Sequence, residues 1–226
     1  MSNKHNSIKF AKMQGCRVPE LYWRGRDVAT LDMAQLPQHY VIRPTIGYSS
    51  KMVFLMDGDL NMMDKQTYSR SAIKEELTKA LAENPLLEFL IEEFVRTEQG
   101  EYRIPDDYKF YMFNGEIACI QVINRLSPKK GYTTCYDENW NQVQNINTYY
   151  PEGASQPKPA CFEEMKDHAR KLSKTYGIFA RIDFYATDKG AVFGEFTPTP
   201  FMGHCFTPAG EQMLVEYWDR FCKGMI

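Results

Sequence analysis

Four polar side chains near the C-terminal end of the sequence could bind a metal ion and phosphate together. Arg181 and Asp183 lie two residues apart in a segment that alternates apolar and polar residues, so they face the same side of a predicted strand. Glu195 and Thr197 share a face of the next predicted strand, and a turn at 188–190 joins the two strands. Adjacent carboxylates repel unless a cation lies between them, and Mg²⁺ binds carboxylate and phosphate oxygens. We therefore expect Asp183 and Glu195 to hold magnesium and Arg181 to stabilise a phosphoryl group.

A second segment, residues 40–54, could form a phosphate-binding hairpin. It reads as a strand, a polar turn and a second strand, with one basic side chain before the turn and another after it. Small residues in the turn could present backbone amides and hydroxyl groups to phosphate oxygens. The residues concerned are Arg43, Gly47, Ser49, Ser50 and Lys51. The pattern GxxxxGK followed by Ser or Thr is absent, so this turn is not a P-loop.

Two further segments lie between these sites in the sequence. Residues 91–95 form an apolar strand with two acidic residues, which suits a slot where an adenine ring packs against apolar atoms. Lys109 lies on a predicted strand among aromatic residues, where it could pair with a phosphate.

Each of these patterns also has a purely structural interpretation, which the sequence leaves open. The strands at 180–185 and 191–196 could form an exposed hairpin face in which Arg181 neutralises the two acids. The turn after Arg43 could be an ordinary hairpin loop, and residues 91–95 could be a core strand. A salt bridge to a nearby acid would equally explain the lysine at position 109.

The segments that must position these residues alternate between helices and strands. Helices are predicted at 8–13, 74–82, 162–175 and 210–221, and strands at 40–42, 52–56, 89–95, 108–113, 116–124, 180–185 and 191–196. Asn114-Gly115 is a strong hairpin signal between two of these strands. Segments 127–132 and 150–159 are predicted to be long loops.

Composition limits the kinds of function. The 226 residues contain 27 Lys and Arg against 29 Asp and Glu, a formal charge of −2, so the chain has no general attraction to nucleic acid or anionic membranes. The six cysteines lie far apart with no CxxC pair, which favours reduced thiols over a zinc site. The first ten residues lack the apolar core of a signal peptide, and no run of about 18 apolar residues could cross a membrane. We therefore expect a cytoplasmic protein with no membrane span.

The order of these motifs resembles the ATP-grasp enzymes. The motifs are VIRP at 41–44, GYSSKMVFL at 47–55, IEEFV at 91–95, RIDF at 181–184 and GEFTPTPFMG at 194–203. With DYKFYMFNGEI at 107–117, they are most similar to the TupA-like branch, over about residues 17–220. The resemblance implies an α+β ATP-grasp fold whose two lobes, with antiparallel sheets, sandwich the nucleotide. Residues 1–95 would form the N-terminal region and first lobe and 96–226 the second, with the N-terminal domain of many members absent or reduced.

The resemblance also implies a role for individual residues. The cofactor-binding residues would be Arg43 in place of a lysine, Gly47, Tyr48, Ser49, Ser50 and Lys51 at the phosphates, Glu92, Glu93, Phe94 and Val95 at the adenine, and Glu98 or Glu101 at the ribose. The catalytic phosphate ligands would be Lys109 and Arg181. The metal ligands would be Asp183, Glu195 and Thr197, with Thr197 in place of an asparagine, for Mg²⁺ or alternatively Mn²⁺.

The reaction implied by the resemblance is ATP-dependent ligation. A carboxylate attacks the γ-phosphate, and an amine or another nucleophile then displaces phosphate from the acylphosphate. The substrates would be small-molecule, peptide or glycan carboxylates and amines in polysaccharide or specialised-metabolite biosynthesis. The basic segment 125–132 could cover a bound anion, and His204-Cys205 would lie near the place where the acceptor enters. A homodimer or partner subunit could complete the acceptor site. Two alternatives stay open: an ATP-dependent kinase of a small molecule or glycan, and a catalytically inactive nucleotide-binding protein.

Overall fold

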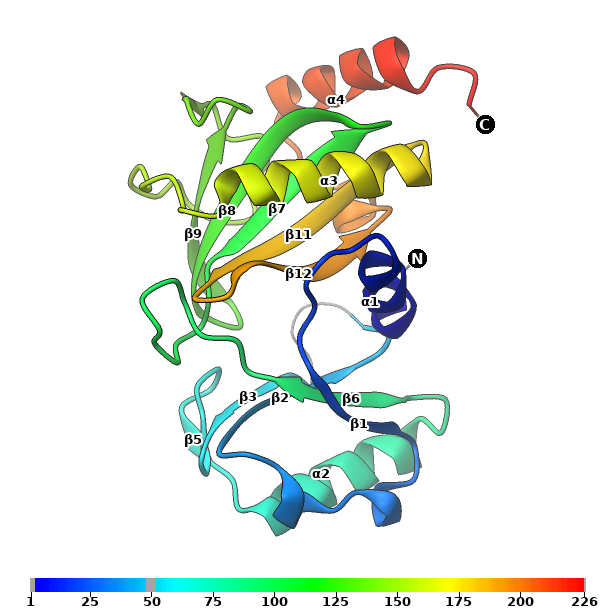
Figure 1. Ribbon diagram of the computed structural model, residues 1–226, viewed down its shortest axis with the longest axis vertical. Coiled ribbons are helices and arrows are strands. Elements are labelled where there is room, and N and C mark those ends of the chain that lie inside the picture. The colour runs from blue at the N-terminus through cyan, green and yellow to red at the C-terminus, as the bar shows by residue number, and fades with distance from the viewer. Residues whose placement is uncertain (1–2, 48–51, 226) are drawn as a thin grey trace.

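A computed structural model describes residues 3–47 and 52–225, and in this part of the chain two antiparallel sheets form two lobes (Figure 1). The sheet of the first lobe has the strand order β1-β6-β2-β3-β4-β5, and that of the second lobe β10-β9-β8-β7-β11-β12. Helices pack on both sheets, so the α+β class predicted from the sequence is confirmed. Over the same residues, none of the helices is both long and apolar enough to cross a bilayer.

The first lobe is a sheet covered on one face by a single long helix. Its strands are β1 (Leu21–Gly25), β2 (His39–Pro44), β3 (Phe54–Asp57), β4 (Leu60–Asn61), β5 (Gln66–Thr67) and β6 (Phe89–Glu93). Helix α2 (Arg70–Glu83) buries Ile73 and Leu77 against this sheet, beside the short helices η1 (Val28–Thr30) and η2 (Met33–Gln35). It begins four residues before the predicted start because the Ser69 hydroxyl caps it by accepting from the Ala72 amide.

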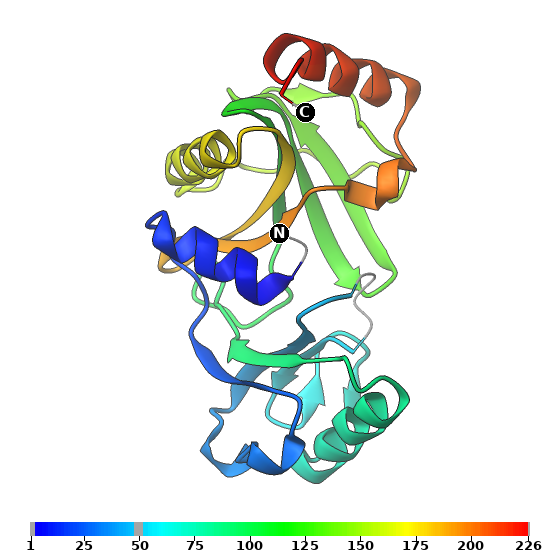
Figure 2. The ribbon, with the colours of Figure 1, turned by 90° about the vertical axis from the view of Figure 1, so that its right-hand side faces the viewer.

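The second lobe has helices on both faces of its sheet. Its strands are β7 (Asp107–Phe113), β8 (Glu116–Ser127), β9 (Lys130–Tyr136), β10 (Gln142–Val143), β11 (Phe179–Thr187) and β12 (Gly190–Thr197). Helices α1 (Lys4–Met13) and α3 (Phe162–Tyr176) pack on one face, and α4 (Pro208–Phe221) packs on the other (Figure 2). The short helix η3 (Pro200–Gly203) follows β12.

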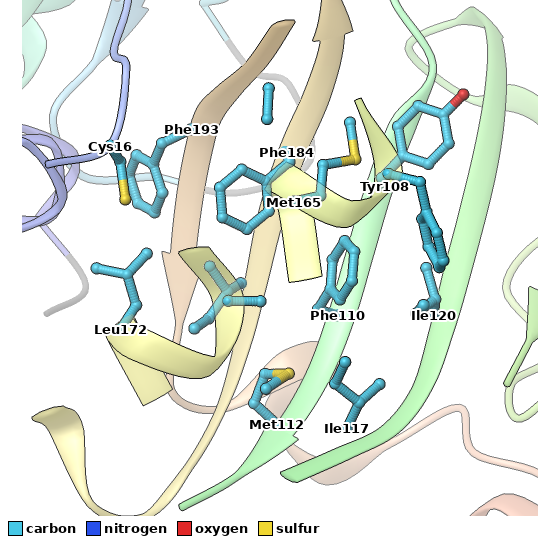
Figure 3. Close-up of a cluster of buried hydrophobic side chains, with 14 of the residues drawn as sticks. Cys16, Tyr108, Phe110, Met112, Ile117, Ile120, Met165, Leu172, Phe184 and Phe193 are labelled. Atoms are coloured by element: carbon cyan, nitrogen blue, oxygen red, sulfur yellow. The ribbon is translucent and has the colours of Figure 1, made fainter. Parts of the chain in front are cut away.

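Strand alternation divides the second sheet into an apolar face and a polar face. Phe110 on β7, Phe184 on β11 and Phe193 on β12 point into a core that Met165 and Leu172 of α3 complete (Figure 3). Because side chains alternate along a strand, the residues next to each phenylalanine in its own strand point to the opposite face of the sheet. The core therefore fixes which face of β7, β11 and β12 carries the charged residues.

A bulge in β12 adjusts this alternation next to the charged residues. The pairing of β11 with β12 shifts by one residue after Asp183, which pairs with Glu195, whereas Phe184 pairs with Phe193. Gly194 is therefore the extra residue of a β-bulge. A Cβ atom at Gly194 would lie 2.9 Å from the Tyr185 ring, so the close packing at this bulge requires glycine.

The N-terminal helix packs on the second lobe. Residues 1–95 are predicted to form an N-terminal region and the first lobe, and α1, which lies in that N-terminal region, packs on the sheet of the second lobe. Ala11 is fully buried in that core, and the Phe10 ring meets the Phe196 ring edge to face at 6.1 Å between centroids. The division at residue 95 stays a prediction for the rest of the chain.

The prediction of a long loop at 127–132 is wrong. Strands β8 and β9 continue to a pair between Ser127 and Lys130, so the segment is a tight hairpin. A Cβ atom at Gly131 would lie 2.9 Å from the Asn124 carbonyl oxygen, so this glycine allows two strands to approach closely. Residues 150–159, all of them described, contain no helix or strand, as predicted.

Candidate functional site

A cleft of about 660 Å³ lies between the two lobes and is lined by both sheets. The first lobe contributes residues of β2, β3 and β6, and the second contributes residues of β7, β11 and β12. Pockets for small molecules commonly measure roughly 300–1,000 Å³, so this cleft is large enough for a nucleotide-sized ligand.

One end of the cleft is apolar. The side chains there come from β2, from β3 and the residue before it, and from the segments that follow β4 and β6: Val41, Val53, Leu55, Met63, Phe94 and Ile104. The predicted adenine hinge, Glu92–Val95, lines the cleft, and its Phe94 belongs to this apolar end. Apolar walls beside a backbone segment suit a ring that carries hydrogen-bonding groups on its edge.

A buried ion cluster occupies the face of the second sheet that borders the cleft. Arg181 Nε and Nη2 donate to the two carboxylate oxygens of Asp183, each at 2.8 Å, and Lys109 Nζ donates to Asp183 Oδ2 at 2.6 Å. Arg181 and Asp183 are two apart on β11, and Asp183 pairs in register with Lys109 on β7. Burial alone would lower the pKa of Arg181, but the adjacent Asp183 raises it above its usual value, so the guanidinium stays charged.

Glu195 and Thr197 lie beside this cluster on β12. Asp183 pairs with Glu195 and Arg181 with Thr197, which confirms that the four side chains share a face. The Thr197 hydroxyl accepts from Arg181 Nη2 at 3.0 Å. Among the acidic side chains that line the cleft in the described residues, that of Glu195 is the most exposed, with 32% of it accessible. Burial would raise the pKa of Glu195, but Lys4 and Arg181 lower it below its usual range, so the carboxylate is ionised.

Arg43 reaches into the cleft from the end of β2. Its Nε lies 2.7 Å from Glu92 Oε1, and its Nη1 donates to the Gly194 carbonyl oxygen at 3.3 Å across the lobes. Its Nη2 is buried and has no hydrogen-bond partner among the residues that the structure describes. Such a group is costly unless a ligand or water satisfies it, so it indicates an anion site. Burial raises the pKa of Glu92, although Arg43 acts in the opposite direction.

Three charged residues of the cleft are not among the predicted catalytic, nucleotide or metal residues, although Arg125 belongs to the predicted basic segment 125–132. Asp107 Oδ2 accepts from Arg125 Nη2 at 3.2 Å and lies 3.5 Å from Lys109 Nζ. Lys4 Nζ lies 3.0 Å from Glu195 Oε1. The sequence could have indicated Asp107, because it lies two residues before Lys109 on the same strand and so faces the same side. Arg125 is indicated only as part of the basic segment 125–132, and Lys4 has no signal, because its partner Glu195 is remote in the sequence.

The predicted ribose acids lie elsewhere. Among the described residues that line the cleft, neither Glu98 nor Glu101 is present. Glu98 Oε1 accepts from the Ala160 amide at 2.7 Å, just before α3, and the side chain of Glu101 is exposed. Gly47 lines the cleft, whereas the predicted phosphate-loop residues Tyr48, Ser49, Ser50 and Lys51 lie outside the described residues.

The end of the cleft beyond the charged cluster is built from segments around η3. Its lining residues include Tyr149, Phe201, Met202, His204 and Cys205. Three of these, Phe201, Met202 and Cys205, have φ angles of 51°, 52° and 64°, which non-glycine residues adopt rarely. Strained backbone of this kind concentrates at ligand-binding segments.

Comparison with known proteins gives a family and a fold. A family model described as TupA-like ATPgrasp matches residues 1–216. The D-alanine–D-alanine ligase from Bacillus anthracis in complex with ATP is 14% identical with a TM-score of 0.59, covering 97% of this chain and 65% of the ligase. The L-amino acid ligase from Bacillus licheniformis is 14% identical with a TM-score of 0.58, and the match covers 87% of this chain and 42% of that ligase. The ATP-grasp ligase PsnB with its minimal precursor is 12% identical with a TM-score of 0.52, and the match covers 96% of this chain and 61% of PsnB.

These structures match 87–97% of this chain, but the chain spans less than two thirds of the length of each. At such low identity the likeness concerns the fold. A search of curated protein sequences found no significant relative.

Proposed function

The chain belongs to the TupA-like ATP-grasp family, and we propose that it uses ATP and Mg²⁺ to join a carboxylate to an amine or another nucleophile. The observation that carries the proposal is the apolar end of one cleft lying beside the cluster of Arg181, Lys109 and Asp183. In this proposal the adenine ring packs against Phe94 and its neighbours, and the phosphates extend toward Arg43 and Arg181.

The charges that line the cleft support a requirement for a divalent metal. Its basic residues, among those described, are Lys4, Arg43, Lys109, Arg125 and Arg181, and its acidic residues are Glu92, Glu93, Asp107, Asp183 and Glu195. The two sets balance, so a triphosphate alone would meet little net positive charge. A metal ion that enters with the nucleotide supplies the missing charge.

The donor set around Asp183 and Glu195 fits such a metal. A carboxylate has about four lone-pair directions, and Asp183 uses three of them on Arg181 and Lys109. Its register partner Glu195 is partly exposed to the cleft. Over the described part of the chain, three or more His, Cys, Asp or Glu side chains nowhere gather as a metal site. Mg²⁺ suits this arrangement because it is commonly held by one or two carboxylates, with phosphates and water completing its shell.

The proposed reaction has two balanced steps. An oxygen of the acceptor carboxylate bonds to the γ-phosphorus of ATP, the bond from that phosphorus to the β,γ-bridging oxygen breaks, and ADP leaves. The amine nitrogen then bonds to the acyl carbon and loses a proton as the bond to phosphate breaks. Bound Mg²⁺ would supply positive charge at the phosphate oxygens. Arg181 and Lys109 would orient the γ-phosphate and stabilise the charge that develops on it.

The acceptor acid and nucleophile would bind at the end of the cleft around η3. This end adjoins Thr199 and Arg125 and carries two exposed apolar groups, Tyr149 and Met202. Arg125 Nη1 donates to the Tyr150 hydroxyl at 3.0 Å, so its guanidinium is held at the edge of this end. A small-molecule, peptide or glycan acid is the proposed substrate class, and cell-surface or specialised-metabolite assembly the proposed setting.

A screen for ADP release tests the proposal. Purified protein is incubated with ATP, Mg²⁺ and paired panels of carboxylates and amines, and products are identified by mass spectrometry. We expect ADP, phosphate and an amide to form together, and we expect Glu195→Gln to lose most of this activity. The matched control is Glu138→Gln, because Glu138 also forms an ion pair, with Arg170 at 2.6 Å, but on the exposed surface away from the cleft.

The products distinguish the alternatives. ADP with a stable phosphorylated product and no amide would identify a kinase. Mg²⁺-dependent ATP binding without any ADP release would identify a nucleotide-binding protein that lacks catalysis. Equal activity of Glu195→Gln and the parent would refute the proposed metal ligand.

A further inference from the structure

The end of the cleft around η3 carries an apolar surface that is open to solvent. It consists of Tyr149, Phe201 and Met202, which all line the cleft and are here called the apolar platform. The rings of Tyr149 and Phe201 lie 5.3 Å apart between centroids. Tyr149 is 46% exposed and Met202 is 77% exposed. Exposed apolar groups that gather in a concave part of a protein mark a surface for a ligand.

The backbone conformation of η3 is not explained by local energetics. Phe201 and Met202 have φ angles of 51° and 52°, in the left-handed region that residues with a Cβ atom adopt rarely. Contacts on one side hold this turn, since the Phe201 ring meets the Phe206 ring at 6.0 Å between centroids. A strained turn that presents an exposed methionine to a cleft indicates a binding role for that side chain.

A chain of contacts connects the apolar platform to the buried ion cluster. Asp107 Oδ2 lies 3.5 Å from Lys109 Nζ and accepts from Arg125 Nη2 at 3.2 Å. Arg125 Nη1 donates to the Tyr150 hydroxyl at 3.0 Å, and the Tyr150 ring meets the Tyr149 ring at 4.8 Å between centroids. Arg125 therefore lies between the apolar platform and the place proposed for the γ-phosphate.

The charges at this end of the cleft suit an anion and not a cation. Its lining residues come from segments 125–128, 149–150 and 199–205, which contain no Asp or Glu. The nearest acid along the chain of contacts, Asp107, is already shared by Lys109 and Arg125. A guanidinium has five N–H groups, and within the described residues Arg125 uses two of them, so it can also bind a carboxylate. An ammonium bound here would have no carboxylate partner, which is costly away from water.

We propose that the acceptor is an apolar carboxylic acid without a charged amino group, and that its hydrocarbon part binds on the apolar platform. This inference rests on the proposed function and narrows its substrate class. The acceptor carboxylate lies beside Arg125 and the γ-phosphate, and an aryl or branched alkyl group packs against Tyr149 and Met202. These two residues therefore determine specificity.

Four acids test the proposed selectivity: 3-phenylpropanoate, phenylalanine, acetate and glucuronate. Phenylalanine is 3-phenylpropanoate with one added ammonium group, and acetate lacks the aromatic group. Each acid is incubated with the parent protein, ATP, Mg²⁺ and hydroxylamine. The hydroxylamine nitrogen bonds to the acyl carbon of the acylphosphate, loses a proton and displaces phosphate, so a hydroxamate forms whatever the natural nucleophile is. Release of ADP and formation of hydroxamate are both measured.

We expect kcat/KM to be highest for 3-phenylpropanoate. One methylene group in a hydrophobic pocket changes kcat/KM on the order of 10- to 200-fold, so an aromatic group on an open surface should gain at least about 10-fold over acetate. Phenylalanine should be poorer than 3-phenylpropanoate by about 10-fold or more, because its ammonium finds no partner. Glucuronate should be a poor substrate, because its hydroxyl groups would face the apolar platform.

Substitutions in the apolar platform test where the aromatic group binds. Tyr149→Ala and Met202→Gln should each lower the ratio of kcat/KM for 3-phenylpropanoate to that for acetate by about 10-fold. The matched controls are Tyr132→Ala and Met13→Gln. Tyr132 is 46% exposed and Met13 is 76% exposed, and neither is among the described residues that line the cleft. Both controls should keep the ratio of the parent.

The outcomes separate this inference from the proposed function. If hydroxamates form but phenylalanine or glucuronate is preferred, or all four acids react equally, the inference is overturned and the proposed function stands. If Tyr149→Ala and Met202→Gln keep the parent's ratio, the apolar group binds elsewhere and the inference is again overturned. If neither these acids nor the wider panel of carboxylates gives ADP, the proposed function fails, and the inference fails with it.

Discussion

Replacing Asp183 by asparagine tests whether one carboxylate holds the buried charge cluster together. Asp183 is 2% exposed and accepts three hydrogen bonds from Arg181 and Lys109. Asparagine keeps the size of the side chain and removes its charge. Afterwards Arg181 keeps the Thr197 hydroxyl at 3.0 Å and Lys109 keeps Asp107 at 3.5 Å, both weaker partners than the original carboxylate.

The expected loss is large because the cluster is buried. Removing one partner of a buried ion pair destabilises a protein by about 3–5 kcal/mol, since a charge is left uncompensated away from water. Asp107 continues to compensate Lys109, so we expect the lower end, about 3 kcal/mol. The control Glu138→Gln breaks an ion pair of 2.6 Å whose side chains are 47% and 42% exposed. Exposed pairs contribute about 0–1 kcal/mol, so this control should unfold almost like the parent.

Urea denaturation measures the difference. Unfolding is followed by tryptophan fluorescence and by far-ultraviolet circular dichroism, because coincident transitions show that the protein unfolds in one step. At a slope of about 2 kcal/mol per molar urea, a loss of about 3 kcal/mol lowers the midpoint by about 1.5 M. If the midpoints of Asp183→Asn and Glu138→Gln lie together near that of the parent, the cluster does not depend on Asp183 and the reasoning is refuted.

Two other substitutions test the charge network and the packing. Burial would raise the pKa of Asp107, but Lys109 and Arg125 lower it below its usual value. The stability that Asp107 contributes should therefore be complete above its unfolded-state pKa of about 3.9 and be lost as the pH falls through the lower folded-state pKa. Asp107→Asn should be less stable than the parent in urea denaturation at pH 7, and a difference undiminished in strong acid would contradict this account. At Gly210 of α4, a Cβ atom would lie 2.2 Å from the Ile146 carbonyl oxygen. Gly210→Ala should therefore destabilise by about 1–3 kcal/mol or more, although alanine favours helices by about 1 kcal/mol. A raised midpoint in thermal denaturation would show that α4 can move away without cost.

The parts of the fold that were predictable depend on neighbours in the sequence. Asn114-Gly115 forms the turn between β7 and β8, with both residues at positive φ, as the hairpin signal requires. Alternation alone places Arg181 and Asp183 on one face, because a strand reverses its side chains at every residue. The short turn after β11 then brings Glu195 opposite Asp183.

The parts that were not predictable depend on contacts between remote segments. The bulge at Gly194 follows from packing against Tyr185, which no local pattern reveals. Arg125 reaches Asp107 because β8 continues past its predicted end at residue 124, two residues beyond Ile123, which pairs with Asp107 on β7. The placement of α1 on the second lobe depends on apolar contacts to strands near the other end of the sequence.

This placement of α1 has a consequence for the order of folding. Helix α1 is synthesised long before β12, the strand against which it packs. An isolated helix of ten residues is marginal in water, so α1 gains its stability only after β12 has been made. The first lobe has its own core and can fold while the second is still being synthesised. The ion pair between Lys4 and Glu195 then forms late, because it requires nearly the full chain. Slow, long-range contacts of this kind limit folding rates, so substitutions in the α1 interface should affect how fast the cleft is completed as well as how firmly it is held.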